Sequence, residues 1–225
     1  MPTAKERLSH LLELAAEGPA RRATLAAELA DLVLNWPADY PAAMRAPVLT
    51  LLEMTVRETD GGTLAQLAAR LGGHGELPLD LVNEFFLYAP KGVRREILMR
   101  NELAGGSEDD GDASPDAAAL VAAARDVRVR DFPEHLGAAM RIAPETAQAI
   151  LADATAEALA VLCRGAHLDR AVFSALALLE GAQDRDPLTR LGAYDTVPQQ
   201  AAERLTRHWR AHHAPPKHTQ AAAAE

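Results

Sequence analysis

The chain of 225 residues is 48% hydrophobic but only 4% aromatic, so Ala, Leu and Val supply most of its apolar content. This composition is typical of helical bundles and excludes a β-sandwich, which draws on β-branched and aromatic residues. The net charge of −9, with no region of surplus Lys and Arg, excludes a nucleic-acid-binding surface based on bulk positive charge.

Helices are predicted along the first third of the chain. Apolar residues recur at helical spacing over residues 8–15, through Leu8, Leu11, Leu12 and Ala15, and Gly18-Pro19 then ends this helix. Thr63 and Gln66 have the spacing of a capping box. Further helices are therefore expected over residues 20–34, 47–58 and 64–71, with Pro47 in the first turn of the second of these.

The stretch "NEFFLYAPKGVRREILMRNE", residues 83–102, predicts a packed pair of helices. An apolar stripe at positions 81, 82, 85, 86 and 89 forms one helical face, and Pro90 begins a second helix. In the second helix Val93, Ile97 and Leu98 are expected to face inward, and Glu96 and Arg100 to pair on the outer side.

A segment without large apolar residues, "AGGSEDDGD", follows this pair and indicates a domain boundary. Such a segment cannot offset the entropy lost when it becomes ordered. We expect a helical subdomain over residues 1–103, an acidic flexible linker over 104–113, a second helical subdomain over 114–213 and a disordered tail over 214–225.

The second half predicts short helices. Ser114 and Pro115 have the residue types of an N-cap and a first helical position. The stripe of Ala158, Leu159, Leu162, Cys163 and Ala166 repeats the spacing seen at 81–89. The expected helices cover residues 116–126, 132–142, 144–152, 155–165, 169–183 and 198–212. The fold class is therefore all-α, with stacked helical hairpins in a HEAT-like array or an irregular helical bundle.

Four basic residues in the second helix of the first pair form a candidate partner or anion surface. They are Lys91, Arg94, Arg95 and Arg100. They alternate with Glu96 and Glu102, which favours an ordinary solvated helix face over a site for phosphate.

The segment "LAVLCRGAHLDRAVFSALAL" allows a helix-turn-helix interpretation, with Gly165 at the turn and a recognition helix from Asp169. That second helix offers Arg170 alone among basic residues and ends at Glu180. It therefore lacks the donors that contacts with DNA bases and phosphates require.

The histidines and the single cysteine suggest no metal or cofactor site. His208, His212, His213 and His218 cluster near the C-terminus without a zinc-protease motif or a Cys ligand, so an exposed segment with adventitious metal binding is expected. His74 is expected to be a plain loop residue. Cys163 lies on an apolar stripe, which predicts a buried, unreactive thiol.

The sequence constrains the function mainly through the catalytic motifs that it lacks. There is no phosphate-cradling glycine loop, nucleophile elbow or carboxylate pair with catalytic spacing, so no enzymatic activity and no cofactor is predicted. The single cysteine permits no intrachain disulfide, and no run of 18 apolar residues occurs, which together favour a soluble, cytoplasmic protein.

Three segments, "NWPADYPAAMRAPVLTLLE", "LPLDLVNEFFLYAPKGVRREILMRNE" and "EALAVLCRGAHLDRAVFSALALL", resemble the bacterial domain-of-unknown-function family 2336. The likeness spans residues 20–212 and implies an all-helical, HEAT-like protein without an assigned activity.

The leading hypothesis is a scaffold or regulatory adaptor that binds a protein partner, without nucleic-acid or membrane partners and with homo-oligomer formation left open. The alternatives are a small-ligand or nucleotide sensor at the hairpin join near Arg94, and DNA binding by the C-terminal half.

Overall fold

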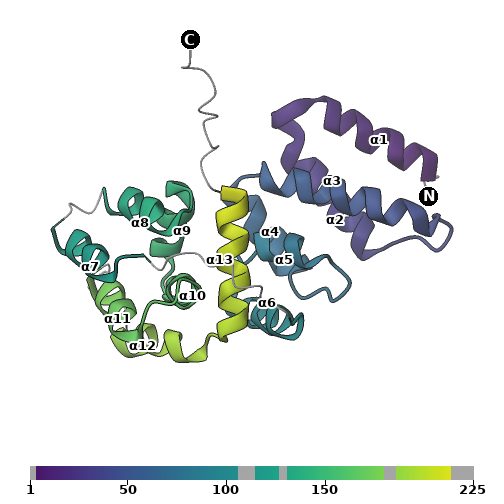
Figure 1. The fold of residues 1–225 in the computed structure, drawn as a ribbon. Coiled ribbons are helices and arrows are strands. Elements are labelled where there is room, and N and C mark those ends of the chain that lie inside the picture. The colour runs from purple at the N-terminus through teal and green to yellow at the C-terminus, as the bar shows by residue number, and fades with distance from the viewer. Residues whose placement is uncertain (1–3, 106–114, 127–130, 180–185, 214–225) are drawn as a thin grey trace, which may run out of the picture. The chain divides into compact units, whose positions relative to one another are not determined.

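A computed structural model describes residues 4–105, 115–126, 131–179 and 186–213. These residues form helices and connecting turns, and no strand occurs among them, which confirms the predicted all-α fold (Figure 1). The chain divides into two compact units, residues 1–100 and 101–225. The division falls inside helix α6 (Lys91–Leu103), just before the predicted end of the first subdomain.

Helix α2 organises the first unit. Its buried residues include Leu25, Leu29, Leu32 and Val33, and it packs against α1, α3 and α4. Figure 1 shows α1 and α3 running alongside it. The helices before α6 are α1 (Ala4–Ala16), α2 (Arg22–Leu34), α3 (Arg45–Arg57), α4 (Gly61–Leu71) and α5 (Leu79–Glu84), with 3-10 turns η1 (Gly18–Arg21) and η2 (Ala42–Met44).

The join between α5 and α6 is buried as predicted, but it is not a long helix. Phe85 and Phe86 are both 0% exposed. The expected continuation of the helix to Ala89 is wrong, because α5 ends at Glu84. From there the backbone tightens: the N–H groups of Phe85, Phe86 and Tyr88 bond to carbonyls three residues earlier. Such tight turns place both rings in the core without a continuous α-helix.

Helix α4 starts earlier than its expected capping box. Asp60 is the N-cap residue, and its carboxylate accepts hydrogen bonds from the N–H groups of Gly62 and Thr63. Thr63 donates its hydroxyl to the same carboxylate instead of capping the helix itself. These bonds hold the pKa of Asp60 below its usual value, since each stabilises the charged form.

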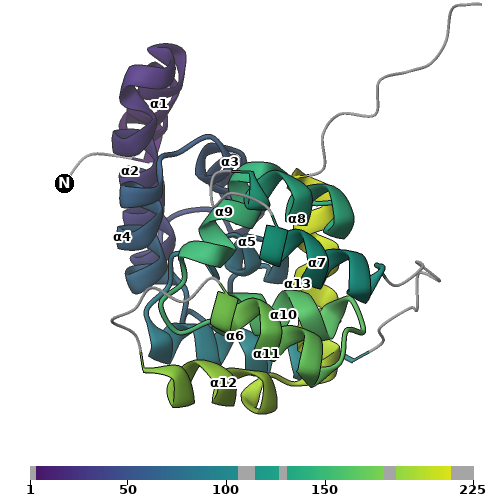
Figure 2. The same ribbon diagram turned by 90° about the vertical axis from the view of Figure 1, so that its left-hand side faces the viewer.

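Helix α10 is the centre of the second unit. It packs against α9, α11, α12 and α13, and Figures 1 and 2 both show it among these neighbours. Its predicted stripe from Ala158 to Ala166 is buried. The helices are α7 (Ala117–Asp126), α8 (Phe132–Met140), α9 (Pro144–Ala152), α10 (Glu157–Gly165), α11 (Arg170–Leu179), α12 (Pro187–Thr196) and α13 (Gln199–His213).

Helix α12 was not predicted, although its first residues carry a recognisable signal. Asp186 is its N-cap and accepts hydrogen bonds from the N–H groups of Leu188 and Thr189, and Pro187 occupies the first helical position. The start of α7 is similar: Asp116 accepts from the N–H groups of two following alanines. The predicted cap, Ser114, lies outside the described residues, as do the tail and all but the first two linker residues.

Candidate functional site

Arg94, the central residue of the candidate anion surface, is buried. It is 8% exposed, and its Nη2 donates to the carbonyl oxygen of Leu87 at 2.9 Å. Its guanidinium carbon lies 5.5 Å from the centroid of the Phe86 ring, within the range of a cation–π contact. Arg94 therefore holds the turn after α5 against α6, and the expectation of a solvated side chain is wrong for this residue.

Arg100 also serves the backbone. It is half-buried, and its two terminal nitrogens donate to the carbonyl oxygens of His74 at 3.2 Å and Leu77 at 2.5 Å. These bonds fix the loop that follows α4, and they differ from the outer-face pair with Glu96 that was expected. Of the four predicted surface residues, Lys91 and Arg95 are the two that are exposed. An anion site at this helix stays a prediction, with two exposed cations to support it.

A partly buried ion pair beside this join was missing from the sequence-based prediction. Nε of Arg57 on α3 lies 2.8 Å from Oε1 of Glu84, whose side chain is almost wholly buried at the end of α5. Arg57 also pairs with Glu53 at 2.5 Å. Burial, with a further contribution from the Glu84 charge, raises the pKa of Tyr88. The Arg57–Glu84 ion pair joins α3 to α5, and the Glu84 carboxylate therefore already has a cation partner.

The predicted helix-turn-helix pair, α10 and α11, presents few donors to a nucleic acid. Arg164 donates to the carbonyl oxygen of Tyr194 at 3.1 Å and lies 5.2 Å from the centroid of its ring. Arg170 forms an ion pair of 2.8 Å with Asp195. Both arginines thus interact with α12, a helix that the helix-turn-helix interpretation did not include.

Cys163 is buried in α10, as predicted. Burial raises the pKa of its thiol to about 12, so the group is protonated at neutral pH. Because the thiolate is the nucleophilic form, we expect the buried thiol to be unreactive. His208, by contrast, was expected on an exposed segment and is buried in α13 instead. The side chains of His212, His213 and His218 lie outside the described residues.

The first unit has a groove between α1 and α3, with α2 as its floor. We call it the α1–α3 groove. It has two hollows that share Leu51 in their lining. The larger, of about 300 Å³, is lined by Leu11, Leu12, Leu29, Ala43, Met44, Pro47, Val48 and Leu51. The smaller, of about 160 Å³, is lined by Leu14, Ala15, Gly18, Arg22, Leu25, Leu51, Met54, Thr55 and Glu58.

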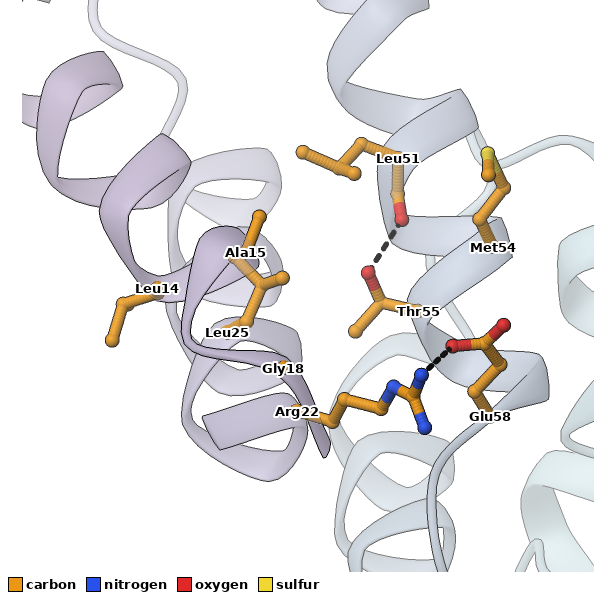
Figure 3. Close-up of a pocket in the computed structure, with 9 residues that line it drawn as sticks. All are labelled: Leu14, Ala15, Gly18, Arg22, Leu25, Leu51, Met54, Thr55 and Glu58. Atoms are coloured by element: carbon orange, nitrogen blue, oxygen red, sulfur yellow. Dashed lines mark hydrogen bonds and ion pairs between the residues drawn. The ribbon is translucent and has the colours of Figure 1, made fainter. Parts of the chain in front are cut away.

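Figure 3 shows the smaller hollow, where an ion pair closes one end of the groove. The guanidinium of Arg22 reaches from α2 to the carboxylate of Glu58 just after α3, with 2.6 Å between Nη2 and Oε2. The Thr55 hydroxyl donates to the carbonyl oxygen of Leu51 at 2.7 Å. These polar groups therefore have partners within the unit, and the apolar part of the groove lies mainly in the larger hollow.

Both rims of the groove carry large exposed apolar side chains. Leu12 on α1 is 66% exposed, and Met54 on α3 is 61% exposed. The groove-lining residues of α3 fall at positions i, i+1, i+4, i+7 and i+8 from Pro47 to Thr55, which places them on one helical face. The sequence contained a signal for this surface, because α1 has more apolar residues than one buried stripe requires.

The described residues contain neither a cluster of metal-ligating side chains nor a membrane-spanning helix. Among them, no group of three or more His, Cys, Asp or Glu side chains lies close enough to hold a metal ion. None of the helices in the described segments has the length and apolar character needed to cross a membrane.

Comparisons with family models, with curated proteins and with solved structures find no match to this chain. The resemblance to domain-of-unknown-function family 2336 stays a prediction.

Proposed function

We propose that this chain is a non-enzymatic scaffold or regulatory adaptor that binds protein partners through the α1–α3 groove. The observation that supports the proposal most directly is the groove itself, which has a large apolar hollow and a smaller one of mixed polarity between rims on which Leu12 and Met54 are mostly exposed. A contiguous exposed apolar surface is costly in water and is characteristic of protein interaction sites. We place the protein in the cytoplasm, since its single cysteine suits a reducing compartment.

The groove supports binding better than the region near Arg94 supports nucleotide sensing. A phosphate site needs guanidinium groups that are free to face the ligand. Arg94 and Arg100 instead donate to backbone carbonyls of neighbouring turns. If a phosphate recruited these two guanidinium groups, the backbone carbonyls would lose their hydrogen-bond donors, which costs free energy. Binding in the groove does not carry this cost.

The test is quantitative capture of partners from the native host after crosslinking, with the full-length chain as bait. Leu12→Glu and Met54→Glu place a charge on each rim, and Leu188→Glu is the control because Leu188 is 80% exposed on α12 in the other unit. We expect the rim variants to reduce recovery of proteins other than the bait at least about tenfold, as hot-spot substitutions do, while the control retains them. Equal recovery by all variants, or no protein above background, would contradict the proposal.

A further inference from the structure

We propose that Met54, on the α3 rim of the α1–α3 groove, is a site of reversible oxidation by peroxides, and that its sulfoxide weakens the binding of protein partners in the groove. This inference rests on the proposed function in taking the groove as the docking surface. It adds a modification site and a means of regulating that surface.

Met54 is the most exposed sulfur-containing residue in the part of the chain that the structure describes. It is 61% exposed, against 57% for Met99 and 0% for Met140. Met44 is half-buried where it lines the larger hollow. Figure 3 shows the Met54 side chain on α3, among the residues that line the smaller hollow. A peroxide must touch the sulfur to oxidise it, so Met54 and Met99 are expected to react first.

We expect no competition from a thiol. Cys163 is the single cysteine of the chain and is fully buried. Burial raises the pKa of its thiol to about 12, so the thiolate, which is the form that reacts with oxidants, is scarce at neutral pH. The exposed thioethers are therefore the sulfurs that a peroxide meets in the folded chain.

The reaction is an oxygen-atom transfer. A lone pair on the Met54 sulfur attacks one oxygen of hydrogen peroxide, the O–O bond breaks, and the proton on the transferred oxygen passes to the departing hydroxide to give water. The thioether is oxidised by two electrons, and the peroxide is reduced. Methionine sulfoxide reductases reverse the change with two thiols, which become a disulfide while the sulfoxide oxygen leaves as water.

The sulfoxide places a hydrogen-bond acceptor on a rim whose neighbouring donors already have partners. The Thr55 hydroxyl donates within its own helix, and Arg22 is paired with Glu58. Arg57, three residues farther along α3, is paired with Glu84. A partner that covers the oxidised side chain therefore buries an acceptor that gains no new donor from this chain. We expect its affinity to fall about tenfold.

Oxidation at Met54 should change this surface without disturbing the core. The side chain is largely exposed, so a polar sulfoxide there stays in contact with water in the free chain. Met140, where a sulfoxide would disrupt the packing of the second unit, is fully buried and protected while the chain is folded. Mild oxidation is therefore expected to leave the urea unfolding midpoint unchanged.

The experiment treats the purified full-length chain with hydrogen peroxide and follows each methionine by peptide mass spectrometry. We expect Met54 and Met99 to gain one oxygen before Met44 and Met140. Treated and untreated chains then serve as bait in the crosslinking capture, in a host lysate from which small reductants have been removed. Oxidation should reduce partner recovery about tenfold, and a purified methionine sulfoxide reductase with dithiothreitol should restore it.

Met54→Leu and Met99→Leu are the matched variants, and each is compared with its own untreated sample. Oxidation should no longer reduce capture by Met54→Leu, which has no sulfur at the rim. Met99→Leu should respond to oxidation as the wild-type chain does, because Met99 lies on α6 and lines neither hollow. Met54→Gln, which imitates the polarity of the sulfoxide, should reduce capture without any oxidant.

Three results overturn the inference while leaving the proposed function in place. They are oxidation of Met44 or Met140 as fast as Met54, undiminished capture by the oxidised wild-type chain, and a loss of partners by oxidised Met54→Leu equal to that of the wild type. An untreated wild-type bait that captures no partner is a different outcome. It contradicts the proposed function itself, and with it the regulation inferred from that function.

Discussion

Replacement of Gly165 by alanine tests the central packing of the second unit. Gly165 is the last residue of α10 and lies against α13. A Cβ built there would sit 2.5 Å from the carbonyl oxygen of Ala202 and 2.1 Å from Oγ1 of Thr206. Thr206 is itself fully buried and β-branched, so it has little freedom to turn away. The absence of a side chain at position 165 is therefore what allows α10 and α13 to approach so closely.

The magnitude follows from the overlap. Ordinary contacts of a Cβ begin near 3.4 Å, so the backbone of α13 at Ala202 must move by about 0.9 Å. Overpacking of this kind costs about 1–3 kcal/mol, against which alanine recovers roughly 0.5–1 kcal/mol of helix propensity. Because the obstacle is backbone in the best-packed helix pair of the unit, we expect a net loss of about 2 kcal/mol in the free energy of unfolding.

Gly192→Ala is the matched control. Gly192 lies in α12 of the same unit, and a Cβ there meets nothing within 4 Å. The chemical change is identical, yet here we expect a gain of about 0.5–1 kcal/mol, since only the propensity contribution remains. The opposite signs separate steric overlap from any general effect of replacing glycine by alanine.

Urea titration followed by tryptophan fluorescence reads this unit directly. The two tryptophans are Trp36, in the first unit, and Trp209, which is buried in α13. With Trp36→Phe as the background, the fluorescence reports the environment of α13 alone. Should Gly165→Ala prove as stable as the background, or Gly192→Ala lose as much as Gly165→Ala, the proposed close packing of α10 on α13 would be refuted.

Three further outcomes are expected. Phe85→Ala and Phe86→Ala should each cost about 3–5 kcal/mol in urea titrations, because both rings are fully buried, whereas exposed Arg95→Ala should stay within about 0.5 kcal/mol; two Phe variants near wild type would contradict the packing. Asp186→Ala should cost about 1 kcal/mol by removing the cap of α12, measured in the same way, and no loss would argue against that cap. Cys163 holds its proton more tightly when folded, with a pKa of about 12 against an ordinary 9.0, so its contribution to stability should be complete below pH 9 and decline above it; rapid reaction with a thiol reagent at pH 8 without unfolding would show that it is not buried.

Apolar periodicity predicted most of the buried helical residues, and the reason lies in the chemistry of those positions. Phe85, Phe86 and the stripe on α10 are aliphatic or aromatic at helical spacing, and burying them is favourable wherever the helix packs. The burial of Glu84 could not be predicted in the same way. It depends on Arg57 from another helix, which pairs with that carboxylate and stabilises its burial.

The groove was not predicted because periodicity identifies an apolar residue without showing what covers it. Leu11 and Leu12 are adjacent on α1 and equally hydrophobic, yet Leu11 is buried and Leu12 is largely exposed. The difference is set by the position of α2 beneath one side of α1, which is tertiary information. Only the surplus of apolar residues on α1 marked this helix as one with a second surface.

Two results have the same physical cause, which is that buried arginines donate to backbone carbonyl groups. This explains why α12 was not predicted, and it weakens the case for the candidate anion surface. Short helices leave many unbonded carbonyl groups at their C-terminal ends, and a guanidinium group can donate to several of them at once. Arg190 on α12 is buried in this way, so an inward position of that helix carries a charge and its apolar period is broken. Three arginines donate hydrogen bonds to backbone carbonyl oxygens in this way. Arg190 donates to Ala177, Arg164 donates to Tyr194, and Arg210 donates to Met140. In a chain with so few aromatic residues, arginine therefore contributes part of the core volume and satisfies carbonyl groups at helix ends.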